Sequence, residues 1–89
     1  MTYTHEYLTE AHKASFANKA AVLVSKICGC FYCRSIYSPD KITEFIDEEQ
    51  PKDETAICPM CGIDSVIGSS SGYPVNDSEF LKAMHKYWF

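Results

Sequence analysis

The chain has 89 residues and a formal net charge of -4, and 46% of its residues are hydrophobic. A chain of this length forms one small domain, and its hydrophobic content indicates a compact fold rather than a disordered one. The acidic balance argues against nucleic-acid binding, which depends on lysine and arginine side chains that neutralise phosphates.

Residues 1–26 are predicted to form an N-terminal helix, with its regular part over residues 4–26. Apolar residues recur there at three- and four-residue steps, which is the period of an α-helix. A second, narrower apolar stripe that includes Phe16 and Leu23 lies on the opposite side of this helix. A helix with two apolar sides needs two neighbours, so this stripe is a candidate contact with a partner or a second copy of the chain. Core packing is the alternative.

The segment over residues 38–54 is predicted to begin as a short helix and to end as a loop. Ser38 and Pro39 suit the N-cap and the first helical position, so we expect a helix from there to about residue 49. A charged run follows, and it is either a solvated connection or a surface for a basic partner. Its acidic residues are Asp47, Glu48, Glu49, Asp53 and Glu54.

The last third of the chain is predicted to contain a β-hairpin over residues 55–67 and a helix over residues 76–89. Asn76 is the predicted N-cap of this helix, with Glu79 as its capping partner. The chain ends on three aromatic residues, which we expect to pack against the domain because an exposed aromatic tip would promote association.

Two Cys-x-x-Cys motifs carry the clearest chemistry in the sequence. Cys30 and Cys33 form the first motif, and Cys58 and Cys61 form the second, with twenty-four residues between them. Each motif presents two thiolates from one turn, and two such turns complete the four-sulfur tetrahedron that Zn²⁺ prefers. A filled shell leaves no position for water or substrate, so we predict one structural zinc ion in a protein that is not an enzyme. Iron is the alternative metal, because tetrahedral sulfur suits it too.

Three residues near these motifs raise further questions. Cys28 is the odd fifth cysteine, and it is a buried structural residue, a redox-active thiol or an alternative ligand. Gly62 follows the second motif and permits the positive φ angle that such a turn needs at its exit. Arg34 stands at the same place after the first motif, which makes this motif the less regular of the two.

These elements predict a small α+β zinc-bound domain over residues 1–89. Two knuckles and a short hairpin form a zinc-binding core over residues 27–67, and three helices pack on it: the N-terminal, middle and C-terminal ones. The N-terminal sequence has no secretory signal and no stretch has membrane-spanning length, so we expect a cytoplasmic protein. The paired cysteine spacing also fits a reducing compartment better than a disulfide framework does.

Four strings in the sequence together resemble a family of small bacterial proteins that carry only the label "cytoplasmic protein". The strings are CGCFYC from Cys28, CPMCGIDSVIG from Cys58, SGYP from Ser71 and MHKYWF from Met84. The resemblance covers most of residues 28–89 and implies a small cytoplasmic protein with two zinc knuckles. More loosely, the chain resembles a zinc ribbon, from which it departs by its predicted helices.

Charge, size and the closed metal shell together favour a non-enzymatic module that binds another protein. A specific hypothesis is a bacterial immunity or antitoxin protein that neutralises a basic nuclease toxin by charge complementarity. A redox- or metal-responsive zinc switch that uses Cys28 is the second hypothesis, and a nucleic-acid-binding zinc ribbon is the third. A homodimer through the first helix is also left open.

Overall fold

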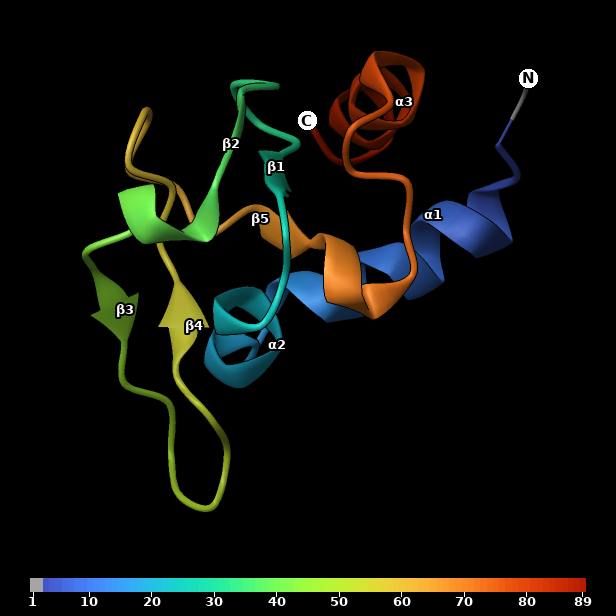
Figure 1. Ribbon diagram of the computed structural model, residues 1–89. Coiled ribbons are helices and arrows are strands. Elements are labelled where there is room, and N and C mark those ends of the chain that lie inside the picture. The colour runs from blue at the N-terminus through green and yellow to red at the C-terminus, as the bar shows by residue number, and fades with distance from the viewer. Residues whose placement is uncertain (1–2) are drawn as a thin grey trace.

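The computed structural model describes residues 3–89 and shows an α+β domain built from three helices and two small antiparallel sheets (Figure 1). None of the helices over these residues has the length and apolar character needed to cross a membrane. In chain order the elements are α1 (His5–His12), α2 (Lys19–Leu23), β1 (Cys28–Cys30), β2 (Ile36–Tyr37), β3 (Phe45–Ile46), β4 (Thr55–Ala56), β5 (Val66–Gly68) and α3 (Ser78–Trp88). Single 3-10 turns cover Lys13–Ser15, Pro39–Lys41 and Ser69–Ser71.

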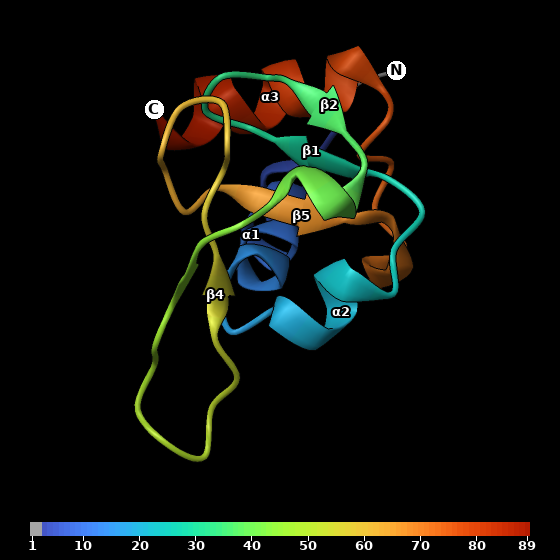
Figure 2. The ribbon, with the colours of Figure 1, turned by 60° about the vertical axis from the view of Figure 1, so that its left-hand side comes forward.

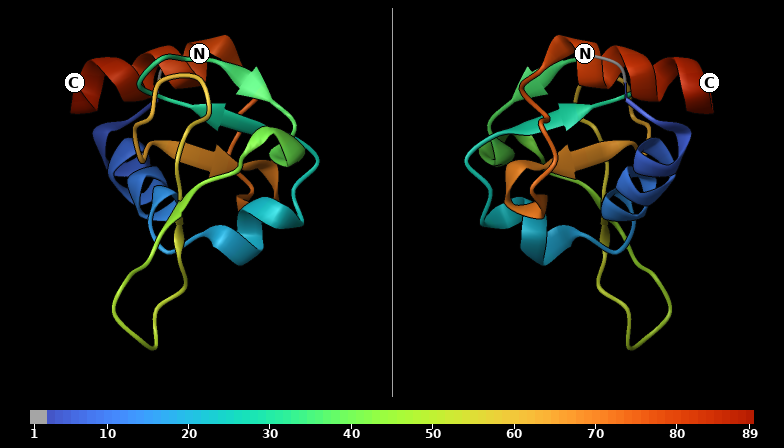
Figure 3. Two further views of the ribbon diagram at one scale, coloured as in Figure 1. Left: turned by 90° about the vertical axis from the view of Figure 1, so that its left-hand side faces the viewer. Right: turned by 90° about the vertical axis from the view of Figure 1, so that its right-hand side faces the viewer.

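The three-stranded sheet has the order β2-β1-β5 and lies in the middle of the molecule (Figure 2). α3 lies at one end of the body and α2 at the other, with this sheet between them (Figure 3). The second sheet pairs Phe45 of β3 with Ala56 of β4 and extends away from the body (Figure 1). We call residues 45–56 the β3–β4 arm.

Buried side chains form two clusters. The first lies between α1, α3 and the sheet and consists of Leu8, Ala11, Phe31, Ile67, Val75, Phe80, Leu81 and Met84. The second surrounds the cysteines and consists of Val22, Cys28, Cys30, Ile42, Ala56, Cys58 and Val66. The predicted α+β class is confirmed, but the positions of several predicted elements are wrong.

The continuous helix predicted over residues 4–26 is wrong, because the chain leaves the helical path between α1 and α2. Ala17 adopts a φ angle of 50°, which interrupts a right-handed helix. Its N–H donates to the Oγ1 atom of Thr55, 2.8 Å away, instead of to a helical carbonyl. Met1 and Thr2, which belong to the predicted range 1–26, lie outside the described residues.

The buried side chain of Asn18 supplies the reason for this break. Its Nδ2 atom donates to the carbonyls of Ala14 and Val66, at 2.9 Å and 2.7 Å, and its Oδ1 atom accepts the N–H of Ala56 at 3.0 Å. Asparagine competes with helical hydrogen bonding by bonding to backbone groups in this way. Asn18 therefore joins the 3-10 turn that follows α1 to strands of both sheets, and the helix does not continue through it.

The helix predicted over residues 38–49 is also wrong. Only the 3-10 turn Pro39–Lys41 forms, and the chain then continues as extended backbone into β3. Ile42 is buried, and the following Thr43, Phe45 and Ile46 are of types that favour strands. Pairing with β4 satisfies the backbone of this segment, so the local signal for a helix start does not extend beyond one turn.

The hairpin predicted over residues 55–67 does not form, because its two strands have other partners. β4 pairs with β3 and β5 pairs with β1, so the second Cys-x-x-Cys motif connects two different sheets. The N-cap of α3 is Asp77 rather than the predicted Asn76. The Oδ1 atom of Asp77 accepts the N–H of Glu79 at 2.9 Å, and its Oδ2 atom accepts the Tyr3 hydroxyl at 2.8 Å.

Candidate metal centre

The four cysteines of the two motifs lie together at the junction of the two sheets. Their sulfur atoms all lie within 4.8 Å of one another, and they form the one group of three or more potential ligands among residues 3–89. The Cys30–Cys61 and Cys33–Cys58 sulfur pairs are each separated by 3.7 Å. Sulfurs placed tetrahedrally at about 2.3 Å from a metal lie about 3.8 Å apart. The cluster therefore has the size of a tetrahedral four-sulfur shell.

The two motifs form the same turn, which we call knuckle 1 (residues 30–35) and knuckle 2 (residues 58–63). The φ angle after the second cysteine is positive in both, 62° at Arg34 and 78° at Gly62, so the less regular first motif adopts the same turn. In each knuckle the first cysteine's N–H donates to a carbonyl five residues later, Cys30 to Ser35 at 3.0 Å and Cys58 to Ile63 at 2.9 Å.

Burial and hydrogen bonding act against each other on the thiols. Burial raises the pKa of Cys30 and of Cys61. Burial opposes ionisation of Cys33 as well, but Ser35 and the neighbouring thiols of Cys58 and Cys30 together outweigh it and lower the pKa of Cys33 to about 7. The Cys58 sulfur accepts the N–H of Met60 at 3.4 Å. A bound cation would supply the remaining charge compensation that four thiolates need.

Tyr37 of β2 is a neighbour of the sulfurs that the sequence analysis missed. Its side chain packs against the cysteine cluster, and burial together with the adjacent Cys58 raises the pKa of its phenol. Its hydroxyl oxygen is buried and has no hydrogen-bond partner. The alternation of β2 could have placed its ring beside the cysteines, but only if the pairing of β2 with β1 had been known.

Knuckle 1 is fixed to the end of α3 through its two aromatic residues. Phe31 is 1% exposed, and its carbonyl oxygen lies 3.2 Å from the Nδ1 atom of His85. The ring of Tyr32 meets that of Phe89 edge to face, with 4.8 Å between centroids. The indole N–H of Trp88 donates to the carbonyl of Leu8 at 3.2 Å. The closing aromatics therefore contact the domain, although Phe89 remains 58% exposed.

Cys28 lies outside the sulfur cluster. It is fully buried in β1, and burial raises the pKa of its thiol to about 11. The structure therefore gives it the environment of a packed core residue rather than that of a reactive thiolate.

Most of the acidic residues predicted to face a partner bind within the chain. Asp53 accepts the N–H of Ala20 at 2.7 Å, and Glu54 forms an ion pair with Lys19 at 2.9 Å, so both serve the start of α2. The Glu48 carboxylate accepts the hydroxyl of Thr55 at 2.7 Å. The two remaining acidic residues of the run, Asp47 and Glu49, are exposed on the β3–β4 arm.

The second apolar stripe predicted for the first helix does not remain a stripe, because the helix is broken. Phe16 lies in the break and is 45% exposed, and Leu23 ends α2 and is 53% exposed. The ammonium group of Lys52, from the β3–β4 arm, lies 5.4 Å from the centroid of the Phe16 ring.

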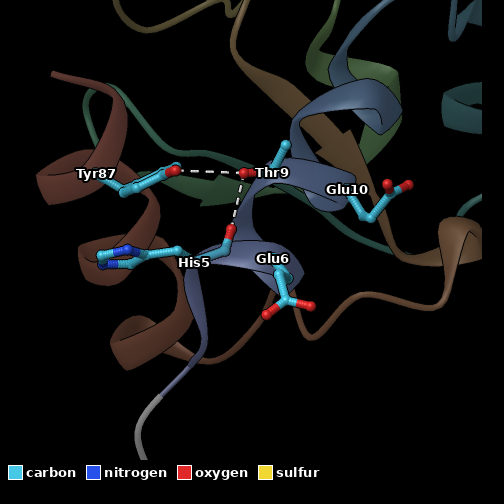
Figure 4. Close-up of a pocket in the computed structure, with 5 residues that line it drawn as sticks. All are labelled: His5, Glu6, Thr9, Glu10 and Tyr87. Carbon is cyan, nitrogen blue, oxygen red and sulfur yellow. Dashed lines mark hydrogen bonds between the residues drawn. The ribbon is translucent and has the colours of Figure 1, made fainter.

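Two surface grooves lie at different ends of the molecule, each with a volume of about 400 Å³. The first, between α1 and α3, is lined by His5, Glu6, Thr9, Glu10 and Tyr87 (Figure 4). Glu6 and Glu10 point away from Tyr87 in this groove, so the two carboxylates and the aromatic ring do not converge on one point. The second lies beside the metal centre and is lined by Ser35, Ile36, Tyr37, Lys41, Pro59 and Met60.

Comparison with protein families, with curated proteins and with solved structures gives no match. The class is therefore defined by the fold and the site: a small α+β domain with four cysteines placed to bind one metal ion. The resemblance to small bacterial cytoplasmic proteins stays a prediction.

Proposed function

We propose that the protein is a zinc-binding domain in which one zinc ion is structural and the surrounding surfaces bind another protein. The sulfur arrangement carries this proposal, because four cysteines at tetrahedral spacing fill the coordination shell of the ion. The ion would join the β1–β2 turn to the segment between β4 and β5. In so small a domain, such a link contributes directly to folding.

A tetrahedral shell of four sulfurs suits zinc and iron alike, so the choice of zinc needs a direct test. Protein purified from cells grown with both metals should contain about one zinc per chain and show no visible absorption. If the purified protein is coloured and contains iron, iron replaces zinc in the proposal and the four-cysteine site is unchanged. A metal-free protein that remains folded would contradict the structural role of the ion.

The proposed partner is a protein with a basic surface, and the specific hypothesis is an immunity or antitoxin role against a basic nuclease. The net charge of -4 and the exposed Asp47 and Glu49 on the projecting β3–β4 arm support this proposal. The surface is smaller than the sequence indicated, because the other acidic residues of the run bind within the chain. Phe16 and Leu23 would add apolar contacts, to a partner or to a second copy of the chain.

Affinity capture at low and high salt tests the acidic part of this surface. The double variant Asp47→Lys/Glu49→Lys should no longer capture a basic nuclease that the native protein captures. Glu6→Lys/Glu10→Lys is a matched control, because it makes the same charge change on α1. If the arm variant captures the nuclease as well as the α1 control variant does, the β3–β4 arm is not the docking site.

Two alternatives receive less support. A redox switch needs an accessible Cys28 thiolate, whereas this thiol is buried with a pKa raised to about 11. Alkylation of Cys28 in the folded, metal-loaded protein would revive that alternative. Binding of RNA or DNA through the knuckles would show as a salt-dependent affinity, which the net charge of -4 disfavours.

A further inference from the structure

Tyr37 stands out because a polar atom is buried beside the sulfur cluster without a partner. Among residues 3–89, its hydroxyl is the one buried side-chain nitrogen or oxygen atom that makes no completed hydrogen bond. Buried hydroxyl groups normally find a partner, because leaving one unpaired costs the free energy of its lost hydration. The Tyr37 hydroxyl therefore needs an acceptor, and it has no hydrogen bond to one among the described protein atoms.

The surroundings of this hydroxyl contain cysteine sulfurs, which are candidate acceptors. β2 pairs Tyr37 with Cys28 of β1, which places the tyrosine ring against the cysteine cluster. The Cys58 sulfur belongs to this cluster and, after burial, has the largest effect in raising the pKa of the phenol. A neutral thiol accepts a hydrogen bond weakly, whereas the thiolate of a metal-bound cysteine carries charge and accepts one well.

We propose that the Tyr37 hydroxyl donates a hydrogen bond to the Cys58 thiolate when the centre holds its metal. This inference deepens the proposed function and rests on it. Tyr37 would be a positioning residue that holds Cys58 in place and lowers the charge density on its sulfur. Met60 already supplies a backbone donor to the same sulfur, so Cys58 would receive one donor from its own knuckle and one from β2.

The neighbouring Ser35 gives this arrangement a parallel at the opposite ligand. Its side chain and backbone help to lower the pKa of Cys33, a cysteine of the other knuckle. Ser35 and Tyr37 both lie at the β2 edge of the sheet and both line the groove beside the metal centre. Hydroxyl groups from one short segment would thus support one ligand from each knuckle, which is the role that groups around metal ligands commonly have.

The substitution Tyr37→Phe separates this proposal from a simple packing role, because the two predict different results. If the hydroxyl has no partner in the loaded protein, its removal relieves a buried polar group and leaves metal affinity unchanged. If it donates to Cys58, its removal weakens zinc binding by about 10-fold, the lower end of the effect of such supporting groups. Competition with a chromophoric chelator measures this affinity.

Tyr7→Phe is the matched control. It removes the same hydroxyl from a half-buried tyrosine that packs in the other hydrophobic cluster. The native protein and Tyr7→Phe should bind zinc equally, and Tyr37→Phe should bind more weakly. With Co²⁺ in place of zinc, Tyr37→Phe should also shift the sulfur-to-metal charge-transfer band. Equal affinities and unchanged spectra for all three proteins would overturn the proposal.

A measurement on the native protein covers the case in which Tyr37→Phe does not fold. In protein loaded with ¹¹³Cd, the Tyr37 hydroxyl proton should exchange slowly with water and show scalar coupling to the metal through the Cys58 sulfur. A proton that exchanges rapidly would overturn the hydrogen bond. Failure of the native protein to bind any metal would instead refute the proposed function itself.

Discussion

Knuckle 1 and knuckle 2 have the same backbone turn but different surroundings. In knuckle 1, the residues between the cysteines are aromatic, and Phe31 is buried against the first hydrophobic cluster. In knuckle 2, the corresponding residues are Pro59 and Met60, which are exposed, Met60 to 67%. The comparison teaches that the cysteines and their hydrogen bonds set the geometry of the turn. The residues between the cysteines decide what each turn holds in place.

Loss of a metal ligand should have the largest effect, and it should be the same for either knuckle. We expect Cys30→Ser and Cys58→Ser each to abolish tight metal binding and cooperative thermal unfolding, because binding and folding are coupled in so small a domain. Calorimetry and metal analysis measure both effects. Cys28→Ala is the control, since it removes a buried cysteine outside the cluster and should retain the metal. Native-like melting of metal-free Cys58→Ser would show that the ion is not structural.

Removal of the buried aromatic ring of knuckle 1 should cause the second largest loss of stability, and it should distinguish the two knuckles. Phe31→Ala removes a fully buried ring from beneath α3 and should lower the free energy of unfolding by about 3–5 kcal/mol. Met60→Ala, at the equivalent turn, should change it by less than about 0.5 kcal/mol because the side chain is exposed. Urea unfolding of both metal-loaded variants measures the difference. Similar values for the two would contradict the asymmetry.

Substitution of the two residues with positive φ angles should change the stability of the protein by smaller amounts and in opposite directions. Gly62→Ala places a Cβ atom in the left-handed region and should destabilise the protein by about 1 kcal/mol. Arg34→Gly removes that strain from knuckle 1 but adds freedom to the unfolded chain, so it should stabilise by less than about 1 kcal/mol. Thermal unfolding with excess zinc compares the two. A stabilising Gly62→Ala would mean that the knuckles do not share one turn.

The cysteine outside the cluster should resist alkylation in the folded, metal-loaded protein. Cys28 is fully buried and its pKa is raised to about 11, so it should label near pH 7.5 only after removal of the metal unfolds the domain. Metal binding needs deprotonated thiols, so the bound metal and the stability that it provides should be lost as the pH falls into the acid range. Mass spectrometry of the labelled protein and metal analysis measure both effects. Rapid labelling of Cys28 would contradict its burial.

The sequence predicts the cysteine cluster more reliably than it predicts how the helices and strands connect and pair. The four ligand cysteines were predicted from spacing alone, and the structure brings them together. The last helix was placed to within two residues at its start, although its N-cap was assigned to Asn76 instead of Asp77. The long first helix was wrong because helical periodicity does not register a buried asparagine that bonds to distant strands.

By itself, the sequence determined what nearby residues can do: two cysteines on one turn, a cap before a helix, an apolar face on α3. These properties depend on groups only a few residues apart. Only the tertiary structure decided which strands pair, that Asn18 divides the first helix, and that Asp53 and Glu54 bond to the start of α2. It also packed Tyr37 against the cluster that contains Cys58. Contacts such as those of Asn18 form because buried polar groups need partners, and in this chain those partners lie 38 and 48 residues away.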